Sequence, residues 1–288
     1  MVITKKPDWI RVKGVDETVL NHMKALLDKY HLHTVCESAV CPNMGTCFKA
    51  GTATFMILGN ICTRNCAFCG VDHGKPQAAD TDEPENVARA ARELQLKHIV
   101  ITSVTRDDLS DGGAQQFAHT IRAINRILPE ATTDVLIPDL KGSYENIKIV
   151  IDARPDILAH NLETVPRLYA ECRQNADYAV SLTVLESSKK LNPDVFTKSG
   201  VMLGLGETRN EVLEVMKDLR TVSCDFLTLG QYLRPAAENL EVKEFITPEV
   251  FEEYRLAGET MGFRYVASSP FVRSSFHAEE ALKHARKS

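Results

Sequence analysis

The stretch that decides the fold is residues 54–69, which read T-F-M-I-L-G-N-I-C-T-R-N-C-A-F-C. The apolar, β-favouring run at 54–58 predicts a buried strand. Cys62, Cys66 and Cys69 follow it in C-x3-C-x2-C spacing. The sequence therefore predicts a strand whose carboxyl end leads into a loop that carries three cysteines.

The alternation of apolar strand and amphipathic helix continues along the chain. Further strands are predicted at 98–102, 133–137, 157–160, 201–205 and 226–229, and helices at 85–96, 114–127, 144–151, 165–172, 181–191, 209–219 and 248–260. Continuous apolar strands that alternate with helices indicate a parallel sheet covered by helices. The predicted fold class is α/β, a partial (β/α)6 TIM-type barrel, whose chemistry lies at the carboxyl ends of its strands.

The composition is that of a globular protein with a core of its own. Of 288 residues, 44% are hydrophobic and 25% are charged, so disulfides are not needed for folding. The net charge of −5 gives no electrostatic argument for nucleic acid. No apolar run reaches the roughly 18 residues of a membrane span, and residues 1–13 have no apolar signal segment. We expect a cytoplasmic protein that binds neither nucleic acid nor membrane.

Six of the eight cysteines fall within residues 36–69, as two triples. The first triple, Cys36, Cys41 and Cys47, has C-x4-C-x5-C spacing. Without a secretory signal, metal binding explains such clusters better than disulfides. Three thiolates on one short loop can ligate three irons of a [4Fe–4S] cube and leave the fourth iron open to a small molecule. For Cys62, Cys66 and Cys69, a zinc knuckle with His73 as fourth ligand is the alternative.

Two further cysteines, Cys172 and Cys224, stand alone in the sequence. One falls on a predicted helix and the other just before a predicted strand. Free cysteines in such positions are common core residues. We therefore interpret both as packing residues.

The C-x3-C-x2-C spacing at the end of a first barrel strand resembles the signature of the radical S-adenosylmethionine (radical SAM) superfamily. Phe68 matches the aromatic residue usual before the third cysteine of that signature. The resemblance implies that the open iron binds S-adenosylmethionine. It also implies that one electron from the cluster cleaves this cofactor to methionine and a 5′-deoxyadenosyl radical.

The order of the two triples narrows the resemblance to the lipoyl synthase family, and it extends over nearly the whole chain. Further matching motifs are residues 6–9 (KPDW), 106–109 (RDDL), 111–113 (DGG), 160–165 (HNLETV), 199–208 (SGVMLGLGET), 229–235 (LGQYLRP) and 273–275 (RSS). The resemblance implies insertion of two sulfur atoms, at C6 and C8 of a protein-bound octanoyl-lysine group. Two S-adenosylmethionine molecules and sulfur from a sacrificed auxiliary [4Fe–4S] cluster would be used.

The resemblance also assigns residues to this chemistry. Cys62, Cys66, Cys69 and Ser274 would be catalytic, and Ser274 would join Cys36, Cys41 and Cys47 as the fourth ligand of the auxiliary cluster. The implied S-adenosylmethionine contacts are Ser103, Asn161, Glu163, Gly200, Gly204 and Glu207. The implied domains are residues 1–49 with auxiliary-cluster ligands, a radical SAM core at 50–267, and an extension at 268–288 with the serine ligand.

Three positions depart from the family pattern. Phe276 stands where tyrosine is usual, Thr105 where aspartate is usual, and Glu241 where proline is usual. None is an expected iron ligand, so the departures concern hydrogen bonds around the site.

The implied partners are octanoylated lipoyl-carrier domains, namely 2-oxoacid dehydrogenase E2 subunits and the glycine cleavage H protein. An electron donor such as ferredoxin or flavodoxin and an iron–sulfur carrier protein would also be needed. Two alternatives stay open from the sequence. One is another radical SAM enzyme with an auxiliary cluster, and the other is a zinc-stabilised binding scaffold.

Overall fold

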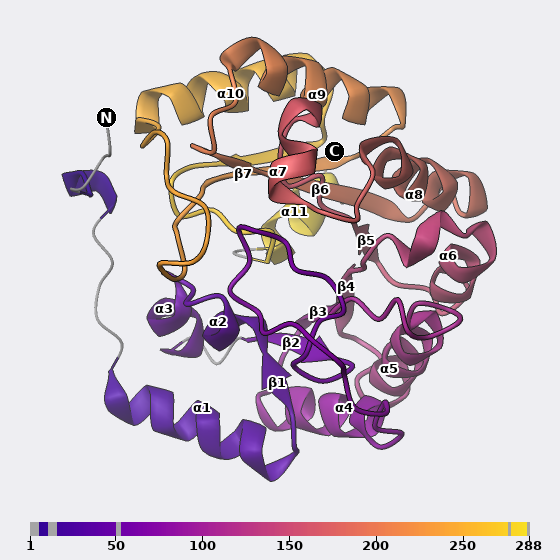
Figure 1. Ribbon diagram of the computed structural model, residues 1–288. Coiled ribbons are helices and arrows are strands. Elements are labelled where there is room, and N and C mark those ends of the chain that lie inside the picture. The colour runs from indigo at the N-terminus through magenta and orange to yellow at the C-terminus, as the bar shows by residue number, and fades with distance from the viewer. Residues whose placement is uncertain (1–5, 11–15, 50–52, 276–277, 287–288) are drawn as a thin grey trace. The chain divides into compact units, whose positions relative to one another are not determined.

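The computed structural model describes residues 6–10, 16–49, 53–275 and 278–286 (Figure 1). The chain divides into two compact units. Residues 13–65 and 70–158 form the N-terminal unit, and residues 1–12, 66–69 and 159–288 form the C-terminal unit. Hydrogen bonds link the strands in chain order, from β1 to β8. In the described part of the chain, no helix has the length and apolar character needed to cross a membrane.

The N-terminal unit is built from strands that alternate with helices. Strand β1 is antiparallel to β2, and β2, β3 and β4 are parallel neighbours. Helices α4 and α5 pack side by side (Figure 1). Its elements are α1 (Glu17–Lys29), β1 (His33–Thr34), α2 (Val35–Ser38), α3 (Met44–Lys49), β2 (Thr54–Ile57), α4 (Glu83–Glu93), β3 (His98–Ser103), α5 (Ala114–Ile127), β4 (Thr132–Leu136), η2 (Leu140–Gly142) and α6 (Tyr144–Ile151).

The local sequence explains two elements of the N-terminal unit, helix α5 and strand β2. Phe117, Ala118, Ile121 and Ile124 recur at helical spacing on α5 and are all buried. Gly113 precedes this helix with φ of +95°, a left-handed conformation that glycine adopts without a steric penalty. All four residues of β2 are buried. The cysteine loop therefore starts from a strand that is fixed inside the unit.

The C-terminal unit has the same alternation, and β6, β7 and β8 are parallel neighbours. Strand β5 (Ile157–Ala159) lies where the residue ranges of the two units meet. The elements are η1 (Asp8–Ile10), η3 (Pro166–Leu168), α7 (Tyr169–Cys172), α8 (Tyr178–Leu191), β6 (Phe196–Leu203), α9 (Arg209–Thr221), β7 (Phe226–Gln231), α10 (Pro248–Thr260), β8 (Tyr265–Ser268) and α11 (Ala278–Ala285).

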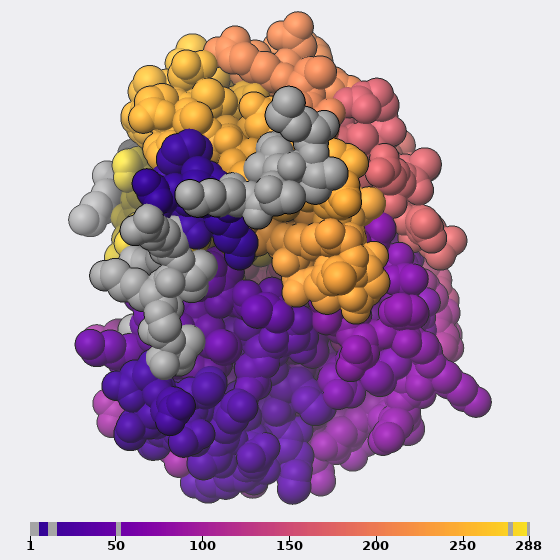
Figure 2. Space-filling view, turned by 60° about the vertical axis from the view of Figure 1, so that its left-hand side comes forward, coloured from indigo at the N-terminus to yellow at the C-terminus, as the bar shows by residue number. Residues whose placement is uncertain are grey.

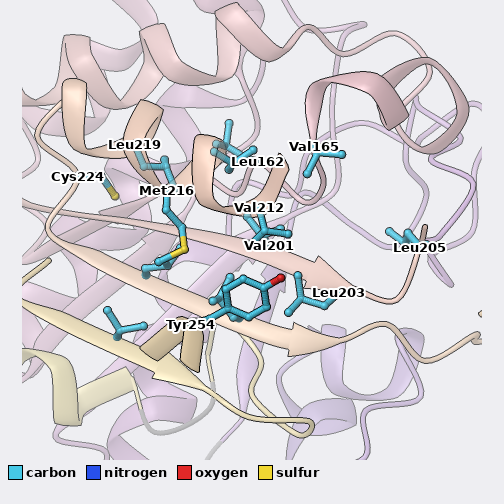
Figure 3. Packing of buried hydrophobic residues seen from close by; sticks show 14 of the residues in the cluster. Leu162, Val165, Val201, Leu203, Leu205, Val212, Met216, Leu219, Cys224 and Tyr254 are labelled. Atoms are coloured by element: carbon cyan, nitrogen blue, oxygen red, sulfur yellow. The ribbon is translucent and has the colours of Figure 1, made fainter. Parts of the chain in front are cut away.

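One hydrophobic cluster forms the core of the C-terminal unit. Figure 3 shows Val212 and Met216 of α9 facing Val201 and Leu203 of β6, and all four side chains are buried. Burying an aliphatic side chain of this size contributes about 1.5–3 kcal/mol. The cluster thereby fixes β6, the strand that carries Gly200 and leads to Gly204.

The predicted α/β class is confirmed, and each predicted strand is present within a few residues. The largest boundary error concerns β6, which begins at Phe196 rather than at 201. Its first half contains the buried polar residues Lys198 and Ser199, which hide the strand from a search for apolar runs. Strands β1 and β8 were not predicted. The helix expected at 165–172 is broken into η3 and α7.

The isolated cysteines lie as predicted. Cys172 and Cys224 are buried in the C-terminal unit and belong to its hydrophobic cluster. Burial raises the pKa of the Cys172 thiol to about 11 and that of Cys224 to about 12. Both thiols therefore stay protonated near neutral pH and act as small apolar side chains.

Candidate functional site

The loop after β2 brings Cys62 against the loop that follows β3. Two main-chain N–H groups point at the Cys62 sulfur, from Thr105 at 3.3 Å and from Arg64 at 3.4 Å. The Cys62 main chain is also paired, since its N–H donates to Asp72 O at 2.8 Å and its carbonyl accepts from Gly74 N at 2.9 Å. The first cysteine of the motif is thus fixed through both its backbone and its sulfur.

The Arg64 side chain ties the same loop to the ends of two strands. Its guanidinium donates to both oxygens of Asp107 at 2.7 and 2.9 Å, and to both oxygens of Asp139 at 2.5 and 2.9 Å. Arg64 is 9% exposed and Asp139 is 5% exposed. Burial alone would lower the pKa of Arg64, but its hydrogen bonds to the two carboxylates outweigh this and raise it. The guanidinium therefore stays charged.

The turn that leads from β2 into this loop is held by two buried charged residues. Glu83 accepts the Leu58 N–H, at 2.9 Å to its closer oxygen, and Arg106 donates to Leu58 O at 3.3 Å. Leu58 has φ of +68°, and its side chain occupies the space that a Cβ on Gly113 would need, 2.4 Å away. Arg106 is 2% exposed and is paired with Asp108.

Cys66 and Cys69 belong to the C-terminal unit, where a different set of contacts holds them. Asn239 donates to the carbonyl oxygens of Ala67 and Cys69 at 3.2 and 2.8 Å. Asn239 lies in the loop between β7 and α10, which is orange in Figure 2 and lies at the surface. Phe68 packs against the hydrophobic cluster of this unit. An aromatic residue at this position thus anchors the end of the cysteine motif.

Cys36, Cys41 and Cys47 lie on or beside the short helices α2 and α3. The Cys36 N–H donates to Thr34 Oγ1 at 3.2 Å, the Cys41 N–H to Cys36 O at 3.0 Å, and the Cys47 N–H to Asn43 O at 2.9 Å. These contacts span only a few residues along the chain. In the described residues, no three His, Cys, Asp or Glu side chains converge as metal ligands would. The donor type, three soft thiols in one short stretch, is nevertheless the one that iron–sulfur clusters use.

Ser274 lies beside two buried polar side chains of the C-terminal unit. Lys198 of β6 donates from Nζ to Ser274 O at 2.8 Å and is 2% exposed. Asn161 donates from Nδ2 to Ser274 Oγ at 3.5 Å and to Glu163 Oε1 at 3.0 Å. Of the residues predicted to contact the cofactor, Asn161 and Glu163 are therefore brought together, and Ser274 joins them.

Gly200 lies inside β6, whereas the strand was predicted to begin at residue 201. A Cβ at Gly200 would stand 2.7 Å from Thr228 Oγ1 and 2.9 Å from Asn161 Oδ1. The missing side chain therefore makes room for Asn161. Burial raises the pKa of Glu163, while the positive charge of Arg173 and the bond from Asn161 oppose this shift.

Gly204 and Glu207 form one turn after β6. Glu207 accepts the N–H groups of Gly204 and Leu205 at 2.5 and 2.9 Å. A Cβ at Gly204 would lie 2.2 Å from Gln231 Nε2, so the protein itself requires glycine there. Burial raises the pKa of Glu207, against the effect of these backbone hydrogen bonds. Thr208 then caps α9, since its side chain accepts the Glu211 N–H.

Two of the predicted cofactor contacts carry buried polar atoms without a hydrogen-bond partner. They are Ser103 Oγ at the end of β3 and Asn161 Oδ1 after β5. A buried polar atom without a partner costs about 1–3 kcal/mol, so such atoms call for an explanation. Hydroxyl and amide groups can both bond the polar edge of a nucleoside-containing cofactor. Each of these atoms, within its own unit, could therefore accept or donate a hydrogen bond to a bound cofactor.

Sequence reasoning missed several residues of this site. Asp139 follows the carboxyl end of β4, the position where barrel enzymes place functional residues. That signal was present in the sequence. Lys198 lies in the half of β6 that was not predicted, so nothing in the sequence indicated that it is buried. Glu83 carried no such signal, because an acidic residue in the first turn of a helix is usually exposed.

The departures from the family pattern have small consequences in the described residues. Thr105 acts through its main chain, which donates to Cys62 Sγ and accepts from Thr63. Any residue except proline at position 105 can make these bonds. Glu241 is exposed and lies 4.0 Å from Lys243. Phe276 lies outside the described residues.

Comparison with known proteins gives consistent results. Residues 56–219 match the radical SAM superfamily. A lipoyl synthase from Caldanaerobacter subterraneus subsp. tengcongensis is 55% identical over 282 residues, which cover 98% of this chain and 99% of that protein. A lipoyl synthase from Alkaliphilus metalliredigens is 53% identical over 283 residues, which cover 98% of both chains.

Solved structures support the fold alone. HydG, a maturase of the [FeFe]-hydrogenase, has a TM-score of 0.60 at 17% identity, over 80% of this chain and 53% of its own. Methylornithine synthase (PylB) has a TM-score of 0.56 at 13% identity, over 70% of this chain and 60% of its own. Both similarities concern the α/β arrangement of strands and helices.

Proposed function

This chain belongs to the lipoyl synthase family of the radical SAM superfamily, and from that premise we propose which of its residues carry the reaction. It is a radical SAM enzyme that inserts sulfur, and its cofactors are [4Fe–4S] clusters and S-adenosylmethionine. The observation that carries the proposal is the pair of cysteine triples in a chain that is 55% identical to a lipoyl synthase over almost its full length.

Cys62, Cys66 and Cys69 hold the cluster that binds S-adenosylmethionine. When bound, this pair of cofactors supplies a carbon-centred radical that removes hydrogen from unactivated C–H bonds, which no side-chain base can do. The protein's part is to fix the three sulfurs. It does so through the Thr105 and Arg64 N–H groups at Cys62 and through Asn239 at the other end of the motif.

Ser103, Asn161 and Glu163 orient S-adenosylmethionine, and Gly200, Gly204 and Glu207 shape the backbone beside it. The unpartnered Ser103 Oγ and Asn161 Oδ1 support the first group. For the second group the support is indirect. Gly200 leaves room for Asn161, and Glu207 holds the turn at Gly204.

Cys36, Cys41, Cys47 and Ser274 hold the auxiliary cluster, which is the source of the inserted sulfur. Serine oxygen is a harder and poorer ligand for a sulfide cube than thiolate, so Ser274 provides one weak corner. Lys198 holds the main chain at that corner. In this arrangement residues 1–49 and 268–288 supply auxiliary-cluster ligands to a core at 50–267.

The substrates are octanoyl groups on lipoyl-carrier proteins, as follows from membership of the family. We further propose 2-oxoacid dehydrogenase E2 subunits and the glycine cleavage H protein as carriers. A ferredoxin or flavodoxin would supply electrons, and an iron–sulfur carrier protein would rebuild the auxiliary cluster. We also propose a reducing compartment such as the cytoplasm, where cysteine clusters bind metal centres rather than form disulfides.

The test is product analysis under anaerobic conditions. Reconstituted protein is incubated with S-adenosylmethionine, dithionite and an octanoylated lipoyl domain, and the domain is analysed by mass spectrometry. We expect the domain to gain two sulfur atoms, as the dithiol under these reducing conditions and with two fewer hydrogens after oxidation to the disulfide. Formation of 5′-deoxyadenosine with an octanoyl chain that is desaturated or unchanged would favour a different radical SAM enzyme with an auxiliary cluster.

A further inference from the structure

In the sequence, Arg64 lies between Cys62 and Cys66, but its guanidinium is not an iron ligand. An arginine that is 9% exposed is costly to bury unless its charge is paired. Its partners, Asp107 and Asp139, lie in the loops after β3 and β4, 43 and 75 residues away along the chain. The guanidinium therefore joins three separate segments of the N-terminal unit at one point.

We propose that Arg64 is a positioning residue for the cluster. Held by Asp107 and Asp139, its guanidinium fixes the segment 62–65 so that two main-chain N–H groups stay directed at the Cys62 sulfur, and this raises the reduction potential of the cluster. The inference rests on the proposed function, because it takes Cys62 as a cluster ligand.

The backbone around Cys62 shows how this position is transmitted. Thr63 N and Oγ1 both donate to Thr105 O at 3.0 Å, and the Thr63 hydroxyl accepts the Asp107 N–H at 3.0 Å. Thr105 is in turn the residue whose N–H points at Cys62 Sγ. We call the contacts of the Arg64 guanidinium with Asp107 and Asp139 the guanidinium clamp. The clamp and the N–H···S contacts are therefore parts of one network.

The sign of the effect follows from electrostatics. One-electron reduction adds negative charge to the cluster, and N–H dipoles directed at a ligand sulfur stabilise that charge. Hydrogen bonds to the sulfurs are one of the main controls of cluster potential. Loosening the clamp should therefore make the midpoint potential more negative and the cluster harder to reduce.

Positioning can be separated from the charge of Arg64 itself. Lysine keeps the positive charge but cannot form the two-pronged contact to two carboxylates. Asp139→Asn removes a negative charge, which by charge alone would make the potential more positive. Loss of the clamp would make it more negative. The two explanations thus predict opposite shifts for Asp139→Asn.

The experiment is a redox titration of the full chain, reconstituted anaerobically with iron and sulfide. Dithionite is the reductant and electron paramagnetic resonance the detector. The relevant signal is the one that S-adenosylmethionine perturbs. Arg64→Lys, Arg64→Gln and Asp139→Asn should all shift the midpoint to more negative potential, with iron content unchanged. Arg167→Lys is the matched control, since Arg167 makes an exposed two-pronged contact with Glu211.

A wild-type midpoint for Arg64→Lys, or a positive shift for Asp139→Asn, would overturn the inference. If the Arg64 variants fail to fold or to load iron, Asp107→Asn replaces them, because Asp107 is the more exposed of the two carboxylates. Its midpoint potential should also become more negative, and a positive shift would overturn the inference. Cys62→Ala separates this inference from the proposed function. If that variant keeps the wild-type iron content and the perturbable signal, the ligand assignment itself is wrong.

Discussion

The two cysteine-bearing segments of the N-terminal unit are held by contacts of different range. Residues 62–65 are tied to the loops after β3 and β4 by the buried Arg64 guanidinium and by Thr63. Residues 36–47 are tied by hydrogen bonds within α2, α3 and the turn between them. Buried Cys36 and Phe48 add apolar contact to this second segment. The side chains of Arg64 and Thr63 thus reach distant loops, whereas the main-chain hydrogen bonds of Cys36, Cys41 and Cys47 are local.

This difference matches the two tasks proposed for the clusters. A cluster that acts in every turnover needs ligands whose geometry does not change, and buried polar networks provide that rigidity. A cluster that gives up sulfide must tolerate the loss of atoms and later be rebuilt. Main-chain hydrogen bonds between near neighbours can break and re-form without disturbing distant loops. The following experiments test this contrast.

Replacing Cys62, Cys66 and Cys69 with alanine should have the largest effect. If these thiolates hold the cluster that binds the cofactor, as proposed, formation of 5′-deoxyadenosine should fall to background. The auxiliary cluster should remain, with about four irons per chain. Chromatography of the nucleoside product is the measurement. Any 5′-deoxyadenosine above background from this variant would show that the motif is not the radical source.

Replacing Cys36, Cys41 and Cys47 with alanine should give the complementary result. Sulfur insertion should be lost, because the donor cluster cannot form. Cleavage of S-adenosylmethionine should survive in part, because the long-range network around residues 62–65 is intact. Both products are measured in one single-turnover reaction. Normal lipoyl product from this variant would refute the sulfur-donor assignment.

Substitution of Ser274, the proposed fourth ligand of the auxiliary cluster, should have a smaller but still strong effect. Ser274→Cys should hold a cube with a tighter fourth ligand and release iron reluctantly, so the lipoyl yield should fall about 10-fold to 100-fold. Ser275→Ala is the matched control and should change the yield little.

Lys198→Met should weaken the retention of auxiliary iron, the opposite of Ser274→Cys, because the Ser274 main chain loses its 2.8 Å donor. It should lose auxiliary iron faster, whereas Lys198→Arg should restore retention.

Equal single-turnover yields from Ser274→Cys and wild type would contradict the weak-corner mechanism. Iron release after turnover, followed with a chelator, is the second readout. Equal release rates in Lys198→Met and wild type would show that this lysine does not hold the corner. Lys189→Met controls for the loss of a lysine from the same unit, since Lys189 pairs with Asp225 instead.

The turn before the cysteine loop should show a pH-dependent stability effect. Burial raises the pKa of Glu83 above its ordinary value of 4.5, so the folded state favours the protonated carboxyl. Stability contributed by this group is therefore present at low pH and is lost as pH rises from the unfolded pKa through the raised folded pKa. In Glu83→Gln, the free energy of unfolding should not fall over this pH range. Denaturant titrations at several pH values give this free energy, and the same dependence on pH in variant and wild type would contradict the role of Glu83.

Cys224→Ala should have the smallest effect. Cys224 is fully buried and remote in sequence from both triples, so activity should match wild type. The free energy of unfolding should drop by about 1 kcal/mol through lost packing. Because burial raises the pKa of its thiol to about 12, Cys224 should also resist alkylation in the folded protein. Loss of a cluster in this variant would contradict its role as a core residue.

The sequence predicted the strands and helices well because their periodicities are local. Helices α5, α6 and α10 begin and end at the predicted residues. The strand β6 was predicted too short, since Lys198 and Ser199 are buried by contacts that no local pattern reveals. The same limit applies to the site. The spacing of the cysteines was visible in the sequence, but the partnership of Arg64 with Asp139 depends on how β2 and β4 fold beside β3.

The central claim is that this chain carries two four-iron sites, one for each triple. Its most direct test is iron and sulfide analysis of the anaerobically reconstituted full chain, with a visible absorbance spectrum, beside the two triple alanine variants. We predict about eight irons and eight sulfides per wild-type chain and about half of each in either variant. About four irons in wild type, or zinc in place of iron at either triple, would contradict the claim.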